Sequence, residues 1–262
     1  MLAFFRNFTL VAVWASLALP AAGAQCTANS GPRTAVLVEL YTSEGCDSCP
    51  PADRWLSSLQ SQGYTPDKVV PLALHVDYWD YIGWKDPYAK REFATRQRRA
   101  AELKRARIVY TPQVLLQGQD FRHWDSREFA STVEKVNSQL PRARLGLTME
   151  SMGRASVDVM LSAELLAAAE KKDAAVYLAA FENKLTSQVV AGENKGKTLP
   201  HDYVVREWVG PIEFGPMLKV DEKRTLPLLP NANPKQSGVA AFVQNRSTGE
   251  VLQALMLPAC GG

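Results

Sequence analysis

Two cysteines separated by two residues, Cys46 and Cys49, stand between a short apolar segment and a helix-start signal. Residues 34–40 are mostly β-branched or apolar, as in a strand that is buried on both faces of a sheet. Because proline is favoured in a first helical turn, Pro50 predicts a helix over about residues 50–62. The cysteines should then lie at a helix amino terminus, where free N–H groups stabilise a thiolate. This context predicts a redox-active pair.

The same spacing also occurs in structural disulfides and in zinc sites. A two-pair zinc ribbon needs a second Cys-x-x-Cys, and the sequence has none. A binding module with an inert Cys46–Cys49 disulfide stays open as an alternative.

Residues 1–24 have the pattern of a secretory signal peptide. Arg6 precedes an apolar stretch over residues 8–19, and small residues at 22–24 suit a cleavage site. Without Arg6, 29 basic residues face 27 acidic ones, and this small net charge does not indicate nucleic-acid binding. No later stretch is long and apolar enough to span a membrane. We therefore expect a periplasmic or secreted protein and leave its oligomeric state open.

Four cysteines in an exported chain allow three disulfide pairings. If Cys46 pairs with Cys49, then Cys26 and Cys260 remain, and we expect them to form a structural disulfide. In the loop-entropy model a bridge across so long a loop stabilises the fold by up to about 5 kcal/mol.

The next segments predict an α/β domain over residues 25–141. An aromatic loop, residues 77–88, follows a buried strand at the sheet edge where open α/β sheets bind ligands. The other elements expected in this domain are a strand at 69–76, a basic helix at 88–107, a hairpin at 113–121 and a helix capped by Asp125 with Glu128.

Beyond residue 141 the pattern changes to short alternating runs, which predict a β-rich, sandwich-like domain over residues 142–262.

The order of elements over residues 34–140 resembles the thioredoxin fold. Thr111-Pro112 matches the position where that family carries a cis-proline facing the cysteines, so the resemblance implies a cis peptide there. More narrowly, residues 39–53, 75–80 and 109–113 resemble a bacterial group of secreted thioredoxin-like proteins known as domain of unknown function 1223. This resemblance implies a fold and a site but no substrate.

Residues 192–198 superficially resemble a phosphate-binding loop. The loop is one residue short and Pro200 breaks the chain where a helix should begin, so we exclude nucleotide binding. With His201, Asp202 and Arg206 the loop resembles a stretch of the same group, which leaves a contact role open. A polar hairpin loop is the favoured interpretation.

We therefore expect an exported thiol–disulfide oxidoreductase that acts on protein or small-molecule thiols and disulfides without a cofactor. Cys46, expected nearer the solvent, would attack the substrate disulfide, and Cys49 would resolve the mixed disulfide. Thr111 and Pro112 would hold the substrate chain beside the sulfurs.

The alternative is a periplasmic copper metallochaperone that uses the same cysteines, because soft thiolates select Cu(I). His75 and His123 are its candidate third ligands. A histidine on an apolar strand is, however, more often a core residue.

Overall fold

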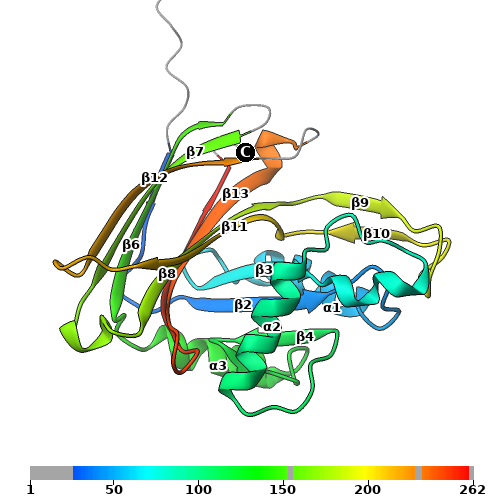
Figure 1. Cartoon of the computed structure of the whole chain (residues 1–262), viewed down its shortest axis with the longest axis horizontal. Helices are drawn as coiled ribbons and strands as arrows, with labels where there is room; N and C mark the ends of the chain where they lie inside the picture. The colour runs from blue at the N-terminus through cyan, green and yellow to red at the C-terminus, as the bar shows by residue number, and fades with distance from the viewer. Residues whose placement is uncertain (1–25, 153–155, 228–231, 260–262) are drawn as a thin grey trace, which may run out of the picture.

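The computed structural model of the chain describes residues 26–152, 156–227 and 232–259. The predicted signal peptide and Cys260, one half of the predicted Cys26–Cys260 disulfide, lie outside these residues, so both remain predictions. The described part contains mixed sheets and few helices (Figure 1). No helix in these ranges is long and apolar enough to cross a membrane.

The largest sheet has eight strands in the order β14-β13-β8-β11-β3-β2-β4-β5. β2 runs parallel to β3, while β4 and β5 continue the sheet antiparallel. The bounds are β2 (Val36–Thr42), β3 (Val69–His75), β4 (Gln113–Leu116), β5 (Gln119–Asp120), β8 (Ala174–Glu182), β11 (Val204–Glu213), β13 (Ser237–Asn245) and β14 (Val251–Pro258).

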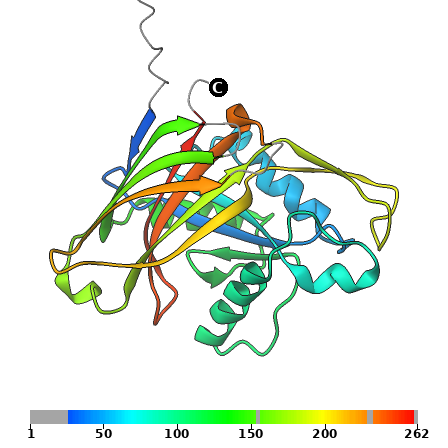
Figure 2. The ribbon, with the colours of Figure 1, turned by 45° about the horizontal axis from the view of Figure 1, so that its top comes forward.

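Two smaller sheets complete the architecture. The four-stranded sheet has the order β1-β6-β7-β12, and β9 pairs with β10 in a separate two-stranded hairpin that extends from the body in Figures 1 and 2. The bounds are β1 (Cys26–Asn29), β6 (Ala143–Met152), β7 (Ser156–Leu165), β9 (Leu185–Gln188), β10 (Thr198–His201) and β12 (Lys219–Pro227).

The helices lie among the first strands. They are α1 (Pro50–Ser58), α2 (Arg91–Leu103) and α3 (Arg127–Asn137), with 3-10 helices η1 (Gln60–Gln62), η2 (Asp77–Ile82), η3 (Ala168–Glu170) and η4 (Pro234–Gln236). The predicted helix start at Pro50 is confirmed. The predicted cap at Asp125 is wrong, because Ser126 is the N-cap residue and its hydroxyl accepts the Glu128 N–H.

β8, β13 and β14 are buried at almost every position because the eight-stranded sheet is covered on both faces. In β8, Val176 and Leu178 pack toward the four-stranded sheet, while Ala179 and Phe181 pack into the core that the helices share. Side chains of a strand point alternately to opposite faces, so a strand covered on both faces is apolar at almost every position.

One strand joins the two predicted domains. β11 pairs in parallel with β3 at Val204 and Ala73 and runs antiparallel to β8 along its other edge. The sheet is therefore continuous across residue 141, where the sequence predicts a domain boundary. This continuity places the β9–β10 hairpin, which directly precedes β11, over the amino-terminal half (Figure 2).

The side chain of Arg96 links the same two halves. Arg96 of α2 donates two hydrogen bonds to Glu39 of β2, at 2.6 and 3.1 Å, and a third to Gln244 of β13 at 3.2 Å. The guanidinium carbon also lies 4.7 Å from the ring centre of Trp208 in β11. Because the Glu39 side chain is buried, the guanidinium of Arg96 is the cation that compensates its negative charge.

We predict that Arg96→Met lowers the free energy of unfolding by about 3–5 kcal/mol, because it leaves the Glu39 charge buried and uncompensated. The double variant Glu39→Gln/Arg96→Met should lose less, since the glutamine is neutral and keeps an acceptor for the Tyr41 hydroxyl. Urea unfolding of both proteins checks this. A double variant as unstable as the single one would contradict the argument.

Candidate functional site

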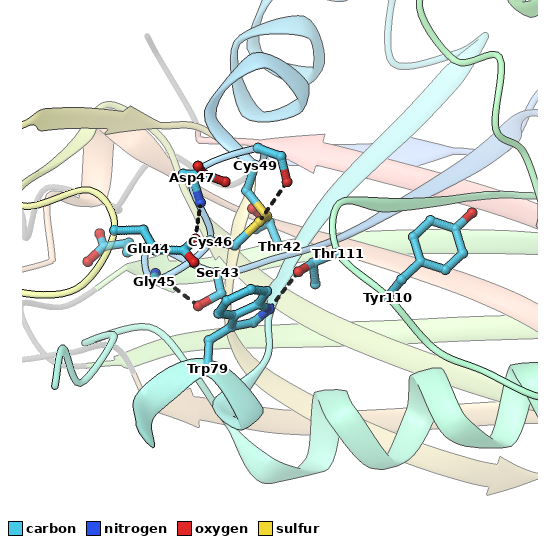
Figure 3. Close-up of a disulfide and its surroundings, with 12 residues drawn as sticks. Thr42, Ser43, Glu44, Gly45, Cys46, Asp47, Cys49, Trp79, Tyr110 and Thr111 are labelled. Atoms are coloured by element: carbon cyan, nitrogen blue, oxygen red, sulfur yellow. Dashed lines mark hydrogen bonds between the residues drawn. A yellow bond between two sulfur atoms is a disulfide. The ribbon is translucent and has the colours of Figure 1, made fainter. Parts of the chain in front are cut away.

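The two cysteines predicted to act together form one disulfide. Cys46 and Cys49 are linked, and the Cys49 backbone is the N-cap of α1, so the pair lies at a helix amino terminus as predicted. The turn from β2 is closed by the Cys46 N–H, which donates to the Ser43 carbonyl at 3.2 Å. Figure 3 shows the disulfide between this turn and the first turn of α1.

Neither cysteine is accessible in this conformation. Cys46 and Cys49 both have 0% of their surface exposed, so the expectation that Cys46 is nearer the solvent stays a prediction. Two segments far from the cysteines in the sequence, η2 and the β9–β10 hairpin, pack on the turn that carries Cys46, and together they are called the cover here.

The first layer of the cover is η2. Trp79 and Ile82 pack on Gly45, where an added Cβ would meet the Trp79 Cβ at 3.1 Å and the Ile82 Cδ1 at 3.2 Å. The indole N–H of Trp79 donates to the Thr111 hydroxyl at 2.7 Å, as Figure 3 shows. Tyr81 stacks on Trp79 from outside and is 81% exposed. The aromatic loop therefore borders the cysteines, as one interpretation of the sequence expects.

The second layer is the loop of the β9–β10 hairpin. Gly192 packs on Ile82 and Trp84, and its φ of +73° suits a glycine. The buried Asn194 amide donates to the carbonyls of Glu44 (2.8 Å) and Cys46 (2.9 Å). The segment interpreted as a polar hairpin loop is thus a direct contact of the cysteine turn.

The predicted cis peptide between Thr111 and Pro112 is present. The Thr111 hydroxyl accepts the hydrogen bond from Trp79, which packs on the cysteine turn. Pro112 lines a separate pocket of about 290 Å³ together with Tyr110 and Phe121. Direct contact of Pro112 with the sulfurs stays a prediction.

A buried polar network lies behind the cysteine turn. Glu44 accepts hydrogen bonds from Trp84 (2.8 Å) and lies 3.1 Å from His201, while its backbone N–H donates to Asp86 at 2.9 Å. Asp86 in turn lies 2.7 Å from His75 Nδ1. Sequence reasoning left a contact role open for the loop of Asn194, but it did not predict these contacts of Glu44, Asp86 and Asn194, because the partners lie in distant segments.

The charges in this network shift one another. Burial lowers the pKa of His75, but the neighbouring Asp86 carboxylate more than offsets this effect, so the pKa is raised overall. Burial pushes the pKa of Asp86 upward, and its ion pair with His75 outweighs burial and lowers it. The pKa values of the two groups therefore depend on each other through this contact.

Asp53 extends the network from α1. It lies one helical turn after Cys49, is buried, and accepts a hydrogen bond from the Thr42 hydroxyl at 3.1 Å. Burial raises the pKa of its carboxyl group. One ligand atom each of Asp53, His75 and His201 lies within 4.8 Å of the other two.

Of the two histidines considered as third copper ligands, only His75 belongs to this buried network. His123 has a side chain that is 73% exposed and lies 2.9 Å from Glu128 at the start of α3.

We predict that Asn194→Ala lowers the free energy of unfolding by about 1–3 kcal/mol, since two buried carbonyls lose their donor. Asn194→Asp, which keeps the shape but replaces the amide donor, should be at least as harmful because a carboxylate faces two carbonyl oxygens. Exchange of the Asp47 N–H, which donates to Glu193 of the same hairpin at 3.0 Å, should accelerate in both variants. Unchanged exchange would show that Asn194 does not hold the hairpin.

The comparisons agree with the fold. The family described as "Protein of unknown function (DUF1223)" matches residues 37–244. Among curated proteins, none matches the chain. A crystal structure of a protein from Agrobacterium tumefaciens is similar over 89% of this chain and 98% of that one, with 25% identity and a TM-score of 0.62. HBP35 of Porphyromonas gingivalis is similar over 89% and 77% of the two chains, with 13% identity and a TM-score of 0.67, which shows the fold alone.

Proposed function

Because the chain belongs to the DUF1223 family, whose function is unknown, we infer its chemistry from the geometry of the site. We propose that the protein is an exported thiol–disulfide oxidoreductase. The observation that carries the proposal is the Cys46–Cys49 disulfide at the amino terminus of α1. A dithiol at that position is stabilised as a thiolate when reduced, because free N–H groups and the helix dipole favour the negative charge.

The surrounding elements support the finer assignment to a thioredoxin-like domain over residues 25–141. A parallel β2–α1–β3 unit is followed by α2, then by antiparallel β4 and β5, then by α3. This is the order on which the resemblance rests. A disulfide in the described chain also suits a periplasmic or secreted location, where disulfides persist.

The reaction is a two-step exchange. In the reducing direction the Cys46 thiolate attacks one sulfur of a substrate disulfide, forms a mixed disulfide and releases the other sulfur as a thiolate. The Cys49 thiolate then attacks Cys46, which frees the second substrate sulfur and regenerates the bond seen here. Two electrons pass from the dithiol to the substrate, and the oxidising direction is the reverse.

The cover sets a condition on this chemistry. Both cysteines are buried, so a neighbouring segment must move before a substrate can reach the sulfurs, and η2, which packs on Gly45, is the segment that we assign to this movement. The hydrogen bond between Trp79 and Thr111 is the part of the cover that competes with a substrate held along Thr111 and Pro112. Release of Trp79 would free the Thr111 hydroxyl and expose the disulfide in one movement.

We predict that Cys49→Ala accumulates mixed disulfides on Cys46, because the resolving thiol is missing. The matched variant Cys46→Ala should accumulate few, and the wild-type protein should accelerate the reduction of insulin by dithiothreitol. Non-reducing gels with mass analysis of the Cys46 peptide provide the measurement. A wild-type disulfide that never exchanges would support the inert binding module, and stoichiometric Cu(I) on the reduced cysteines in anaerobic titration would support the metallochaperone.

We further predict that Trp79→Ala increases the rate at which dithiothreitol reduces the disulfide by about tenfold or more, the effect of weakening the cover by about 1.4 kcal/mol. Trp79→Phe keeps the apolar cover and removes the hydrogen bond to Thr111. Its reduction rate should therefore lie between those of the wild-type protein and Trp79→Ala. Alkylation of freed thiols over time follows the reaction. Equal rates in all three proteins would mean that η2 does not control access.

A further inference from the structure

We propose that Asp53, His75 and His201 bind one divalent transition-metal ion, with zinc the best fit, in the buried network behind the cysteine turn. The three side chains come from α1, from the end of β3 and from the end of β10. One ligand atom of each lies within 4.8 Å of the others, and the residues are only 6%, 0% and 2% exposed. The inference does not depend on the redox proposal.

Two buried nitrogens in this cluster lack a partner. Among the described residues, His75 Nε2 and His201 Nδ1 have no hydrogen-bond partner and no access to solvent. Buried polar atoms are almost always satisfied, so an unpaired one requires an explanation. Two such atoms on rings whose centres are 5.0 Å apart point to a shared ligand.

The other nitrogen of each ring faces a carboxylate. His75 Nδ1 lies 2.7 Å from Asp86, and His201 Nε2 lies 3.1 Å from Glu44. When each of these nitrogens donates its hydrogen, the unpaired nitrogen of the neutral ring carries a lone pair. A histidine that binds a metal through one nitrogen and a carboxylate through the other is the usual arrangement in metal sites.

The supporting carboxylates are themselves held in place. Asp86 accepts the backbone N–H groups of Glu44 and Tyr88, each at 2.9 Å, and Glu44 accepts the Trp84 indole N–H at 2.8 Å. The Thr42 hydroxyl likewise orients Asp53. The ligand side chains are therefore already oriented before an ion arrives, which lowers the entropy lost on binding.

The local charge also favours a cation. Three buried carboxylates surround two imidazoles, namely those of Glu44, Asp53 and Asp86 around His75 and His201. The buried Arg206 pairs with Glu182 at 3.4 Å, so its charge is already matched. A dication would offset the remaining negative charge with both rings neutral.

Two imidazoles and one carboxylate match the three-ligand sets that zinc accepts with a fourth position open. Ligands about 2.1 Å from a tetrahedral ion lie about 3.4 Å apart, so binding would draw the three side chains together by up to about 1.4 Å. His201 lies on the β9–β10 hairpin, and movement of this hairpin gives the ion a way in. The ion would then fasten the hairpin, and with it the cover, to α1 and β3.

The test uses the full chain, refolded with and without Zn²⁺ and then freed of loosely bound ions. We expect about one zinc per chain by elemental analysis. X-ray absorption should show only nitrogen and oxygen ligands near 2.0–2.1 Å, with no sulfur at about 2.3 Å. Absence of stoichiometric zinc, or a sulfur shell, would overturn the proposal without any variant.

Variants locate the ion. His201→Gln should lose the bound zinc, and Asp86→Asn, which removes only the supporting carboxylate, should bind zinc about 10–100-fold more weakly. His123→Gln and Cys46→Ser/Cys49→Ser should retain one equivalent. Zinc should raise the melting temperature of wild-type protein but not of folded His201→Gln. Equal zinc content in His201→Gln, or loss of zinc in the cysteine variant alone, would refute the assigned ligands.

Discussion

One buried residue, Glu44, holds together the segments that make the site. Its backbone N–H donates to Asp86, its carbonyl accepts from Asn194, and its carboxylate meets Trp84 and His201. A buried carboxylate is costly unless each oxygen is satisfied, so the surrounding segments must all be in place at once. The turn that carries the cysteines, the aromatic loop and the β9–β10 hairpin therefore form a single polar unit.

The second half of the chain therefore contributes residues to the candidate site itself. β11 adds to the edge of β3 and so directs the preceding hairpin over the cysteines. The same strand carries Trp208, against which the buried Arg96 stacks. The continuous sheet, the contacts of Arg96 with Gln244 and Trp208, and the cover all join the halves. A separately expressed segment of residues 25–141 would lack the hairpin that packs on its site.

Much of the local structure could be predicted from the sequence. The helix start at Pro50, the alternating pattern of β7 and the cis Thr111–Pro112 peptide each depend on neighbouring residues or on a family motif. The pairing of β11 with β3, by contrast, joins residues 131 positions apart, and no local pattern encodes it. β10 also escaped prediction, because Thr198–His201 contains a proline and pairs only with the short β9.

The candidate site divides in the same way. The cysteines stand out by their spacing, whereas Asp53, His75 and His201 are single polar residues in three separate elements. The sequence contained little that pointed to these three residues. The chain has only three histidines, and one of them, His75, ends an apolar strand. Their meeting follows from the fold and not from any spacing.

The cover has one more consequence, which concerns the order in which the molecule is made. Asn194 and Glu193 lie about 150 positions after the cysteine turn that they contact. Contacts of such separation form late, since a long segment must first be ordered. A nascent chain that has emerged only as far as α3 contains both cysteines and η2 but lacks the β9–β10 hairpin, the second layer of the cover. Synthesis of the carboxyl-terminal half is thus the event that completes the cover of the cysteine turn, and until then the thiols lack the protection of the hairpin.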